Sequence, residues 1–346
     1  MTPPKYGVVV AIDRIDKPIP AVESLGKLPA NEKPAEVFVA VGRNPSVQRN
    51  YGLNECKSPL VYFLDEDSWV IAGTAPRLVS HFQGERTAVA GGPNLPHLDA
   101  TDFEKSASAV LASWMGSFKV RNRYASIGSV KEATEKDLIL CNLMVRRAFF
   151  QKEEGFRPHL YPNEENELLN RLMHAGYQLI YDPAAAIYRP RRKNLPSFCH
   201  QSYRYGAGRA RQMKTYPCLS DLVHLVPFFF VLYVFSLFAP LVLPAGNLAG
   251  EVISSWLWRS PFILFLLLAA GTGISVVSWF RRPIDLIGVP ALIFFRQFFY
   301  GFGLVGGFLT PIPRPQGDVR LYKAVYKGSS YKLVPVKITK RKNAPL

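Results

Sequence analysis

The sequence has few cysteines, no signal peptide and none of the common nucleotide-hydrolysis motifs. Its four cysteines, Cys56, Cys141, Cys199 and Cys218, show no paired spacing, which argues against a zinc cluster or a disulfide framework and favours a reducing compartment. The first residues hold too short an apolar run for a signal peptide, so we expect the first 220 residues to stay in the cytosol. A Walker lysine loop and a nucleophile elbow are missing, and no GxGxxG string follows a predicted strand, which removes ATP hydrolysis, nicotinamide chemistry and serine esterases as leading functions.

Acidic residues are scarce in two segments, and the formal net charge of +16 is concentrated there. The segment from Tyr188 to Tyr216 has eight Lys and Arg residues and no acid, and the segment from Pro311 to Leu346 has nine against Asp318 alone. Both lie next to long apolar stretches, so we interpret the basic residues as facing anionic membrane lipids. A nucleic-acid partner is therefore not expected.

Two long runs without Asp, Glu, Lys or Arg predict membrane spans. Leu222 to Pro244 has 23 residues and Ser260 to Phe280 has 21, and at ~1.5 Å per residue each could cross roughly 30 Å of hydrocarbon. A third apolar stretch, Leu286 to Leu309, carries Arg296 near its middle, where a charge costs ~2.5 kcal/mol or more on insertion scales. A third crossing would also place the basic tail outside, against the positive-inside tendency. We favour two spans with an interfacial or re-entrant third segment, and a third span is the alternative.

The N-terminal part alternates short β-branched runs with helix-length segments. Strands are predicted at Val8 to Ile12, Glu36 to Gly42, Leu60 to Leu64 and Thr87 to Gly91, and a helix with acids in its first turn is predicted from Asn163 to Ala175. This order is typical of an α/β fold with a Rossmann-like mixed sheet that is rich in parallel strands. In such sheets ligands bind at the carboxyl ends of strands.

The chain is expected to have three parts. Residues 1–216 form a cytosolic α/β domain, and residues 217–310 form a membrane domain with spans at about 222–244 and 260–280. Residues 311–346 form a basic tail, in which two partly alternating segments around Gly328-Ser329-Ser330 predict a hairpin.

The sharpest motif is Asp65-Glu66-Asp67, which comes directly after the apolar strand LVYFL. Three neighbouring acids repel each other unless a positive charge lies among them. A divalent cation that bridges the acids to a diphosphate would supply that charge, because hard cations bind carboxylate and phosphate oxygens together. A solvated turn is the alternative interpretation.

Several further motifs follow one another in the first 216 residues. They are Arg49-Asn50-x-Gly52-Leu53, Pro59 to Ser68 (PLVYFLDEDS), Ala90-Gly91-Gly92-Pro93-Asn94, Cys141-Asn142-Leu143-x-Val145-Arg146-Arg147, Glu154-Gly155-Phe156, Asn163 to Leu168 (NEENEL) and Gln201-x-x-Arg204-Tyr205-Gly206-x-Gly208-Arg209. In this order they resemble the motifs of membrane-associated family 2 glycosyltransferases, over roughly residues 6 to 216. No single motif is specific, and their order carries the signal.

The resemblance implies a GT-A fold for nucleotide-diphospho-sugars, an inverting transfer and a Mg²⁺ or Mn²⁺ cofactor. Asp67 would bind the metal, and Asp65 would hold the nucleotide sugar or assist the metal. Asn50 and Arg204 would belong to the donor-binding residues. Asp13, after the first strand, is a candidate for a nucleoside contact, with an ordinary turn acid as the alternative. The family's base-reading Asp after the second strand is missing here, so the donor stays open among UDP-, GDP- and dTDP-sugars.

Glu165 matches the acid that serves the family as catalytic base, and Glu164 and Glu167 are the alternatives. A carboxylate suits this task when burial raises its pKa towards neutrality. The family usually has Asp at this position, and the extra methylene of Glu could move the carboxylate by about 1 Å. The competing interpretation is that these acids only favour the start of a helix.

The role of Arg204 has two interpretations. In Gln201-x-x-Arg204-Tyr205, where Tyr replaces the Trp of related synthases, its guanidinium could pair with the donor diphosphate. Alternatively, the segment from Arg189 to Arg211 is the basic cytosolic flank of the first span and binds lipid phosphate.

We therefore expect an enzyme of the cytoplasmic (inner) membrane with its catalytic domain in the cytosol. It would move one sugar from a nucleotide-diphospho-sugar to a lipid-linked or membrane-associated glycan. Transfer to polyprenyl phosphate is one alternative, and that acceptor needs no base because it is already ionised. A non-catalytic scaffold of a glycan assembly complex is the other.

Overall fold

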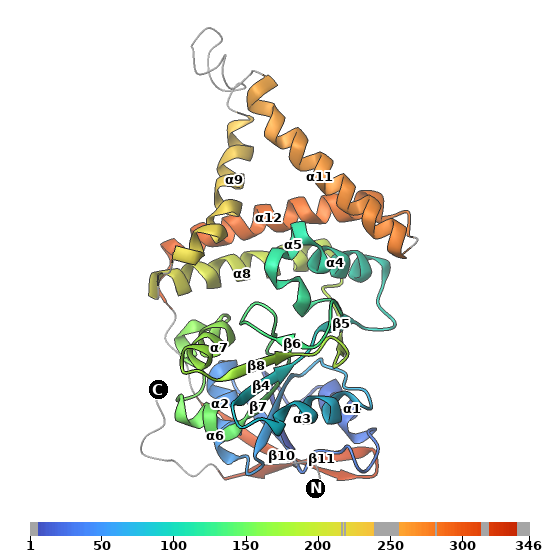
Figure 1. Ribbon diagram of the computed structural model, residues 1–346, viewed down its shortest axis with the longest axis vertical. Coiled ribbons are helices and arrows are strands. Elements are labelled where there is room, and N and C mark those ends of the chain that lie inside the picture. Colours follow the sequence, from blue (N-terminus) through green and yellow to red (C-terminus); the bar gives the residue numbers. More distant parts are fainter. Residues whose placement is uncertain are drawn as a thin grey trace. The chain divides into compact units, whose positions relative to one another are not determined.

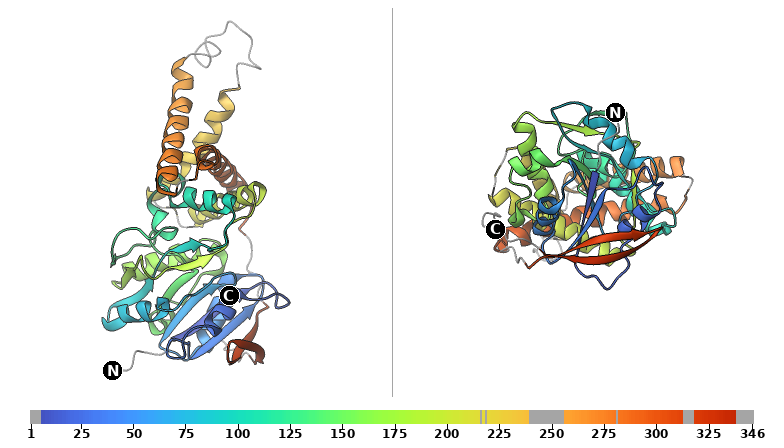
Figure 2. Two further views of the ribbon diagram at one scale, coloured as in Figure 1. Left: turned by 90° about the vertical axis from the view of Figure 1, so that its right-hand side faces the viewer. Right: turned by 90° about the horizontal axis from the view of Figure 1, so that it is seen from below.

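The computed structural model describes residues 6–215, 217, 219–238, 256–280, 282–312 and 318–337. The chain divides into two compact units, each described by itself below (Figures 1 and 2). The sheet unit comprises Met1–Asp99, Lys119–Pro190 and Pro313–Leu346, and the helical unit comprises Ala100–Phe118 and Arg191–Ile312. The predicted first span (222–244) and the predicted tail (311–346) extend in part into residues outside the described ranges.

A mixed sheet forms the centre of the sheet unit. Its strands in the described part of the chain are Tyr6–Ile12 (β1), Glu36–Val41 (β2), Leu60–Asp65 (β3), Thr87–Gly91 (β4), Lys131–Glu132 (β6), Asn142–Arg146 (β7), Gln178–Tyr181 (β8), Arg320–Lys327 (β10) and Ser330–Val336 (β11). The order across the sheet is β11-β10-β2-β1-β3-β7-β4-β8-β6. β1 runs parallel to β2 and β3, and β7 is inserted antiparallel between β3 and β4. Short strands β5 (Asn94–Pro96) and β9 (Ile187–Arg189) form a second, parallel pair.

Helices cover both faces of the large sheet, as Figure 1 shows. They are Pro20–Gly26 (α1), Pro45–Glu55 (α2), Thr74–Ser80 (α3), Arg147–Lys152 (α6) and Glu164–His174 (α7). The start of α2 illustrates how the sequence sets a boundary. The side-chain oxygen of Asn44 accepts hydrogen bonds from the backbone N–H of Ser46 and Val47, and Pro45 occupies the first helical position.

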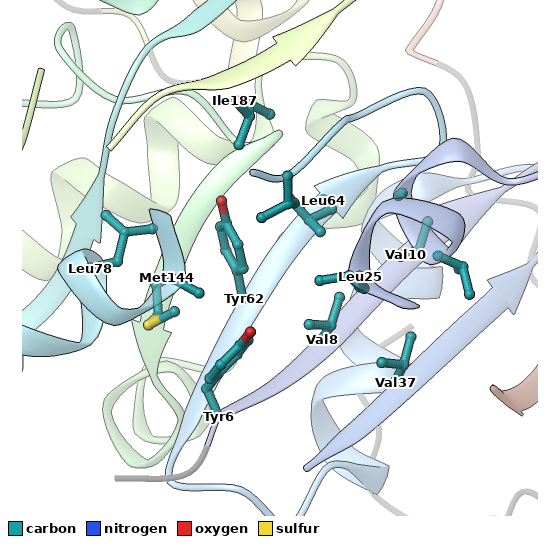
Figure 3. Close-up of a cluster of buried hydrophobic side chains, with 14 of the residues drawn as sticks. Tyr6, Val8, Val10, Leu25, Val37, Tyr62, Leu64, Leu78, Met144 and Ile187 are labelled. Carbon is teal, nitrogen blue, oxygen red and sulfur yellow. The ribbon is translucent and has the colours of Figure 1, made fainter. Parts of the chain in front are cut away.

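The strands bury both of their faces, so their side chains divide into two cores. On β1, Val8 and Val10 point to one core and Val9 to the other. On β3, Tyr62 belongs to the first core and Phe63 to the second. Figure 3 shows the first core, where side chains from β1, β2 and β3 meet Leu25 of α1 and Leu78 of α3. This double burial explains why the strands are apolar runs rather than alternating ones.

The strands and the helix predicted from the sequence are present, with boundaries that differ by at most two residues. Strand β7 was not predicted, because its five residues (NLMVR) have no periodicity that marks a strand. Its extended form follows from pairing with β3 and β4 on its two sides.

The C-terminal hairpin is part of the same sheet as the first strands. β10 and β11 pair antiparallel around Gly328, whose φ of +67° suits glycine. The first half of β10 also pairs antiparallel with β2, with Arg320 opposite Val41 and Lys323 opposite Phe38. Residues 320–327 therefore add a strand beside β2, although about 280 residues separate the two strands in the sequence.

The helical unit consists of Asp102–Ala112 (α4), Trp114–Ser117 (α5), Leu195–Thr215 (α8), Val226–Ser236 (α9), Trp256–Phe280 (α11) and Asp285–Leu309 (α12). Figures 1 and 2 show α8 and α12 lying side by side, with α9 and α11 rising from this layer on the same side. Glycines allow α8 and α12 to approach closely. A Cβ atom at Gly206 would overlap the backbone of Tyr300, and one at Gly303 would overlap the backbone of Tyr203.

Polar side chains on α12 contact α4 and α5. Arg296 donates hydrogen bonds to the carbonyl oxygen of Gly116 and to the hydroxyl of Ser117, and Gln297 donates to the carbonyl oxygen of Met115. At the start of α12, Asp285 accepts a hydrogen bond from Ser106 of α4. The contacts of Arg296 provide partners for the one charge within 286–309, which makes this apolar segment unusual.

By length and composition, two described helices could cross a membrane, α11 (Trp258–Val277) and α12 (Asp285–Leu309). In α11 most apolar side chains are exposed, among them Leu267 at 64% and Ile274 at 59%. Exposed apolar surface of this extent requires an apolar environment or a partner.

The close approach of α2 to β1 can be tested by adding one methyl group. We expect Gly52→Ala to lower the free energy of unfolding by roughly 1–3 kcal/mol, because the new Cβ would overlap the side chain of Val9. Gly84→Ala is the matched control, since its Cβ would come no closer than 3.4 Å to Thr87, and a change within about 0.5 kcal/mol is expected. Denaturant unfolding in detergent measures both. Equal stabilities of the two variants would contradict this packing.

Candidate active site

The carboxyl ends of β1 and β3 lie side by side and carry three of the predicted acids. Backbone pairing sets Ala11 of β1 opposite Asp65, the last residue of β3. Asp67 follows in the turn after β3, and Asp13 follows β1 and is exposed. The side chains of Asp65 and Asp67 are 28% and 35% exposed. A ligand can therefore reach both carboxylates from solvent.

One arginine, Arg189, joins the two acids of the Asp-x-Asp motif. Its Nη1 lies 2.9 Å from Oδ2 of Asp65, its Nε lies 2.8 Å from Oδ1 of Asp67, and its Nη2 donates a hydrogen bond to Oδ2 of Asp67 at 3.1 Å. Strand pairing explains the position. Tyr188 and Trp69 exchange backbone hydrogen bonds of 2.8 and 3.0 Å, which hold the end of β9 beside the turn that contains Asp67.

A second arginine, Arg49 of α2, connects the end of β3 to the start of α7. Its Nη2 donates to Oδ1 of Asp65 at 2.8 Å, and its Nη1 donates to Oε1 of Glu164 at 3.0 Å. Burial alone would raise the pKa of Asp65, but Arg189 and Arg49 outweigh it, so the pKa of Asp65 is below its ordinary value. Asp65 is therefore a carboxylate, and Arg49 holds it beside the first turn of α7.

The two acids that open α7 have different surroundings. Glu164 is buried, and this burial together with the neighbouring Glu165 raises its pKa to about 7, although Arg49 opposes the shift. Oε2 of Glu164 has no hydrogen-bond partner within the described ranges. Glu165 is more accessible, with a side chain that is 13% exposed and an Oε1 atom 3.7 Å from Nη1 of Arg123. Of the two, Glu165 is the one that a substrate could reach directly.

The other predicted residues are held by different partners or belong to the other unit. The amide of Asn50 donates to the carbonyl oxygen of Phe156 at 2.7 Å and accepts from its N–H at 2.9 Å, which ties α2 to the loop before α7. The carboxylate of Glu167 lies 3.0 Å from Arg171 on the same helix. Arg204 lies on α8, in the helical unit.

Arg189 is the residue of the site that sequence reasoning missed. One of the two interpretations of the segment from Arg189 to Arg211 was the basic flank of a membrane span, and neither assigned a role to Arg189. The structure places this residue in the sheet unit, where it pairs with acids. Arg189 is the last residue of the short strand β9, and strand ends meet at the edge where ligands bind. Only the pairing of Tyr188 with Trp69 shows which turn it reaches.

Two carboxylates, and not a complete set of protein ligands, are available for a divalent cation. In the described part of the chain, no group of three or more His, Cys, Asp or Glu residues could hold a metal ion. Mg²⁺ commonly binds to one or two protein carboxylates, and substrate phosphates and water supply its other ligands. Asp65 and Asp67 fit such a shared site, and Arg189 is bound to the same carboxylates.

The sheet order, the antiparallel β7 and the Asp-x-Asp turn after β3 define a GT-A glycosyltransferase fold. The structure of a mannosyltransferase from Pyrobaculum calidifontis, in complex with GDP-mannose and Mn²⁺, has a TM-score of 0.50 to this chain. The two are 13% identical, and the match covers 85% of this chain and 86% of that one. Residues 5–153 match the model of Glycosyl transferase family 2. The chain therefore carries a glycosyl transferase family 2 domain.

Two curated relatives extend this result. The succinoglycan biosynthesis protein ExoA of Rhizobium meliloti is 25% identical over 202 residues, which cover 58% of this chain and 56% of ExoA. The pre-mycofactocin glycosyltransferase of Mycobacterium tuberculosis is 24% identical over 168 residues, which cover 49% of this chain and 34% of that protein. The chain thus matches about half of one relative and a third of the other.

The raised pKa of Glu164 predicts a pH-dependent loss of stability. The unfolded value is near 4.5 and the folded value is about 7, so the folded state binds this proton more tightly. The resulting stabilisation is complete below about pH 4.5 and is lost as the pH rises through about 7. Glu164→Gln should therefore gain stability relative to the wild type over this interval. Thermal unfolding at several pH values measures it, with Glu132→Gln as an exposed control; parallel curves for Glu164→Gln and the wild type would contradict the assignment.

Proposed function

We propose that the protein is a membrane-anchored, inverting and metal-dependent glycosyltransferase that moves a sugar from a nucleotide-diphospho-sugar to a lipid-linked or membrane-associated glycan. The observation that carries the proposal is the accessible Asp65 and Asp67 pair at the carboxyl end of β3, inside the segment that matches Glycosyl transferase family 2. The structural neighbour is a mannosyltransferase and one curated relative is a pre-mycofactocin glycosyltransferase, and both support the same reaction class.

On the donor side, Asp65 and Asp67 would bind Mg²⁺ or Mn²⁺ together with the diphosphate of the nucleotide sugar. A cation held by these two carboxylates would supply positive charge against the negative charge of the departing nucleoside diphosphate. The low pKa of Asp65 keeps that carboxylate ionised across the physiological range. Asp65 is also held by Arg49, so its position relative to α7 does not depend on the cation.

On the acceptor side, Glu165 would take the proton of the attacking hydroxyl. The acceptor oxygen forms a bond to the anomeric carbon as the bond from that carbon to the diphosphate oxygen breaks. Direct displacement from the opposite face inverts the anomeric configuration. Glu164 is the poorer candidate, because one of its oxygens accepts from Arg49 and its side chain is only 2% exposed. Glu167 is held by Arg171.

Nucleoside-diphosphate release tests this assignment. The purified protein in lipid nanodiscs is supplied with UDP-, GDP- and dTDP-sugars, Mg²⁺ or Mn²⁺ and a membrane lipid extract. We expect one donor to support turnover, and we expect Glu165→Gln to reduce kcat by about 10²–10⁴-fold, because an amide cannot accept the hydroxyl proton. Asp67→Asn should reduce turnover to a similar extent and weaken the dependence on the cation.

Glu167→Gln is the matched control, since it removes a carboxylate from the same helical turn, and it should keep most of the activity. If Glu165→Gln kept full activity while Asp67→Asn did not, the base assignment would be wrong and an ionised acceptor such as polyprenyl phosphate would be favoured. No release from any donor would contradict the transferase proposal.

The pairing of β10 with β2 supports the membrane arrangement that we propose. One hydrogen-bonded sheet lies on one side of a membrane, so residues 320–327 lie on the same side as β1, β2 and β3. The chain between β9 and β10 must therefore cross the membrane an even number of times. This supports two crossings, one at α11 and one at the apolar stretch that includes α9.

The contacts of α12 support an in-plane position for this helix. The segment 100–118, which contains α4 and α5, is joined at both ends to the sheet unit. α12 contacts it at Asp285, at Arg296 and at Gln297, over the first half of the helix. A helix that crossed the bilayer would carry Arg296 and Gln297 into the hydrocarbon, at a cost of ~2.5 kcal/mol or more for the Arg. Lying at the interface avoids that cost.

Sidedness can be measured by cysteine labelling in sealed vesicles. Ser329→Cys in the hairpin and Glu85→Cys in the sheet unit, each combined with Cys218→Ser, should react with a membrane-impermeant maleimide from the same side. Cys56, Cys141 and Cys199 are buried and provide a low background. Permeabilised vesicles give the total labelling. Reaction of the two sites from opposite sides would contradict an even number of crossings.

A further inference from the structure

Arg189 occupies the carboxylates that the proposed function assigns to the metal. Its three nitrogens lie 2.8 to 3.1 Å from oxygens of Asp65 and Asp67, so a single guanidinium bridges both acids. Its backbone is held by the Tyr188 and Trp69 pair, and its side chain is 22% exposed. Backbone pairing therefore fixes the residue that bridges the two acids, and the side chains of Asp65 and Asp67 remain partly exposed to solvent.

Asp65 and Asp67 are each already paired with a protein cation. Arg49 neutralises Asp65 from one side, and Arg189 neutralises Asp65 and Asp67 from the other. A divalent cation that arrived alone would bring two further positive charges next to two arginines. A nucleoside diphosphate would bring negative charge and phosphate oxygens, for which the planar fork of an arginine is well suited.

We propose that Arg189 competes with the divalent cation for Asp65 and Asp67, and that the diphosphate of the donor releases the two acids by attracting the Arg189 guanidinium. Cation binding and nucleotide binding are then coupled. Each ligand raises the affinity of the other by the same factor, because coupling between two binding events is reciprocal. The inference deepens the proposed function and rests on it for the donor site.

The chemistry of arginine supports this exchange. Its guanidinium stays charged at every physiological pH, so it cannot leave the acids by losing a proton and must be drawn to another anion. The pKa of Arg189 is raised further, because its proximity to Asp67 and Asp65 outweighs the opposing effect of burial. Only the arrival of a competing anion for Arg189, or of a competing cation for the acids, changes the pairing.

Direct Mn²⁺ titration tests the coupling without an activity assay. The full-length protein in nanodiscs is titrated with Mn²⁺ and free Mn²⁺ is followed by electron paramagnetic resonance, with no nucleotide, with UDP and with GDP. For the wild type we expect weak Mn²⁺ binding that tightens when the preferred diphosphate is present. For Arg189→Ala we expect Mn²⁺ alone to bind about 10- to 100-fold more tightly than to the wild type. The further increase in Mn²⁺ affinity that the diphosphate causes should be smaller in this variant.

Three controls keep the result interpretable. Arg77→Ala removes one positive charge from the same unit, where Arg77 pairs with Asp182, and should leave Mn²⁺ affinity unchanged. Asp67→Asn should abolish the binding, which assigns it to this site. Arg189→Lys keeps the positive charge but loses the planar guanidinium that bridges the two acids. Its Mn²⁺ affinity should therefore lie between those of the wild type and Arg189→Ala. Unfolding midpoints show which variants are folded.

Equal or weaker Mn²⁺ binding by folded Arg189→Ala would overturn the proposal. So would diphosphate binding by the wild type with no Mn²⁺ binding in any variant, because Arg189 would then serve as the permanent counter-charge. These outcomes are distinct from a failure of the proposed function, which would appear as absent sugar transfer whatever the Mn²⁺ titration gives.

Discussion

The carboxyl edge of the central sheet gathers Asp65, Asp67, Glu164 and Glu165, and the structure depends on the arginines that lie among them. A buried carboxylate without a partner is strongly destabilising, by about 3–5 kcal/mol when one member of a buried pair is removed. Arg49 lies between Asp65 and Glu164 and serves both acids. The end of β3 and the start of α7 are therefore connected by one side chain, which relates the donor side of the proposed site to its acceptor side.

The acids of the Asp-x-Asp motif are also paired with an arginine. With Arg189 on Asp65 and Asp67, the acids are compensated in the protein alone. In the proposed function an anionic donor and a divalent cation bind at these acids together, and under our proposal Arg189 would link the two events by changing partners. Arg189 reaches the acids through backbone pairing rather than through a long flexible loop, because Tyr188 is hydrogen-bonded to Trp69.

A second constraint comes from the return of the chain to the sheet. The hairpin expected in the basic tail is present, and its first strand extends the sheet at β2. This pairing ties the C-terminal strands to the first strands, and in the proposed membrane arrangement it limits the number of crossings between them to an even one. The polar residues of α12 then have a structural explanation, since Arg296 and Gln297 contact α5 rather than lipid.

The sequence by itself determined the class of fold, the Asp-x-Asp turn and the acids at the start of α7. These features are local, because neighbouring residues encode each of them. They are an apolar run buried on both faces, a turn directly after it and a first helical turn. Only the tertiary structure decided the partners of those acids, the antiparallel place of β7 and the joining of β10 to β2. Each of these brings together residues far apart in the chain, as with Arg49, Glu164 and Arg189. Their pairing depends on packing and strand register, which no local pattern records.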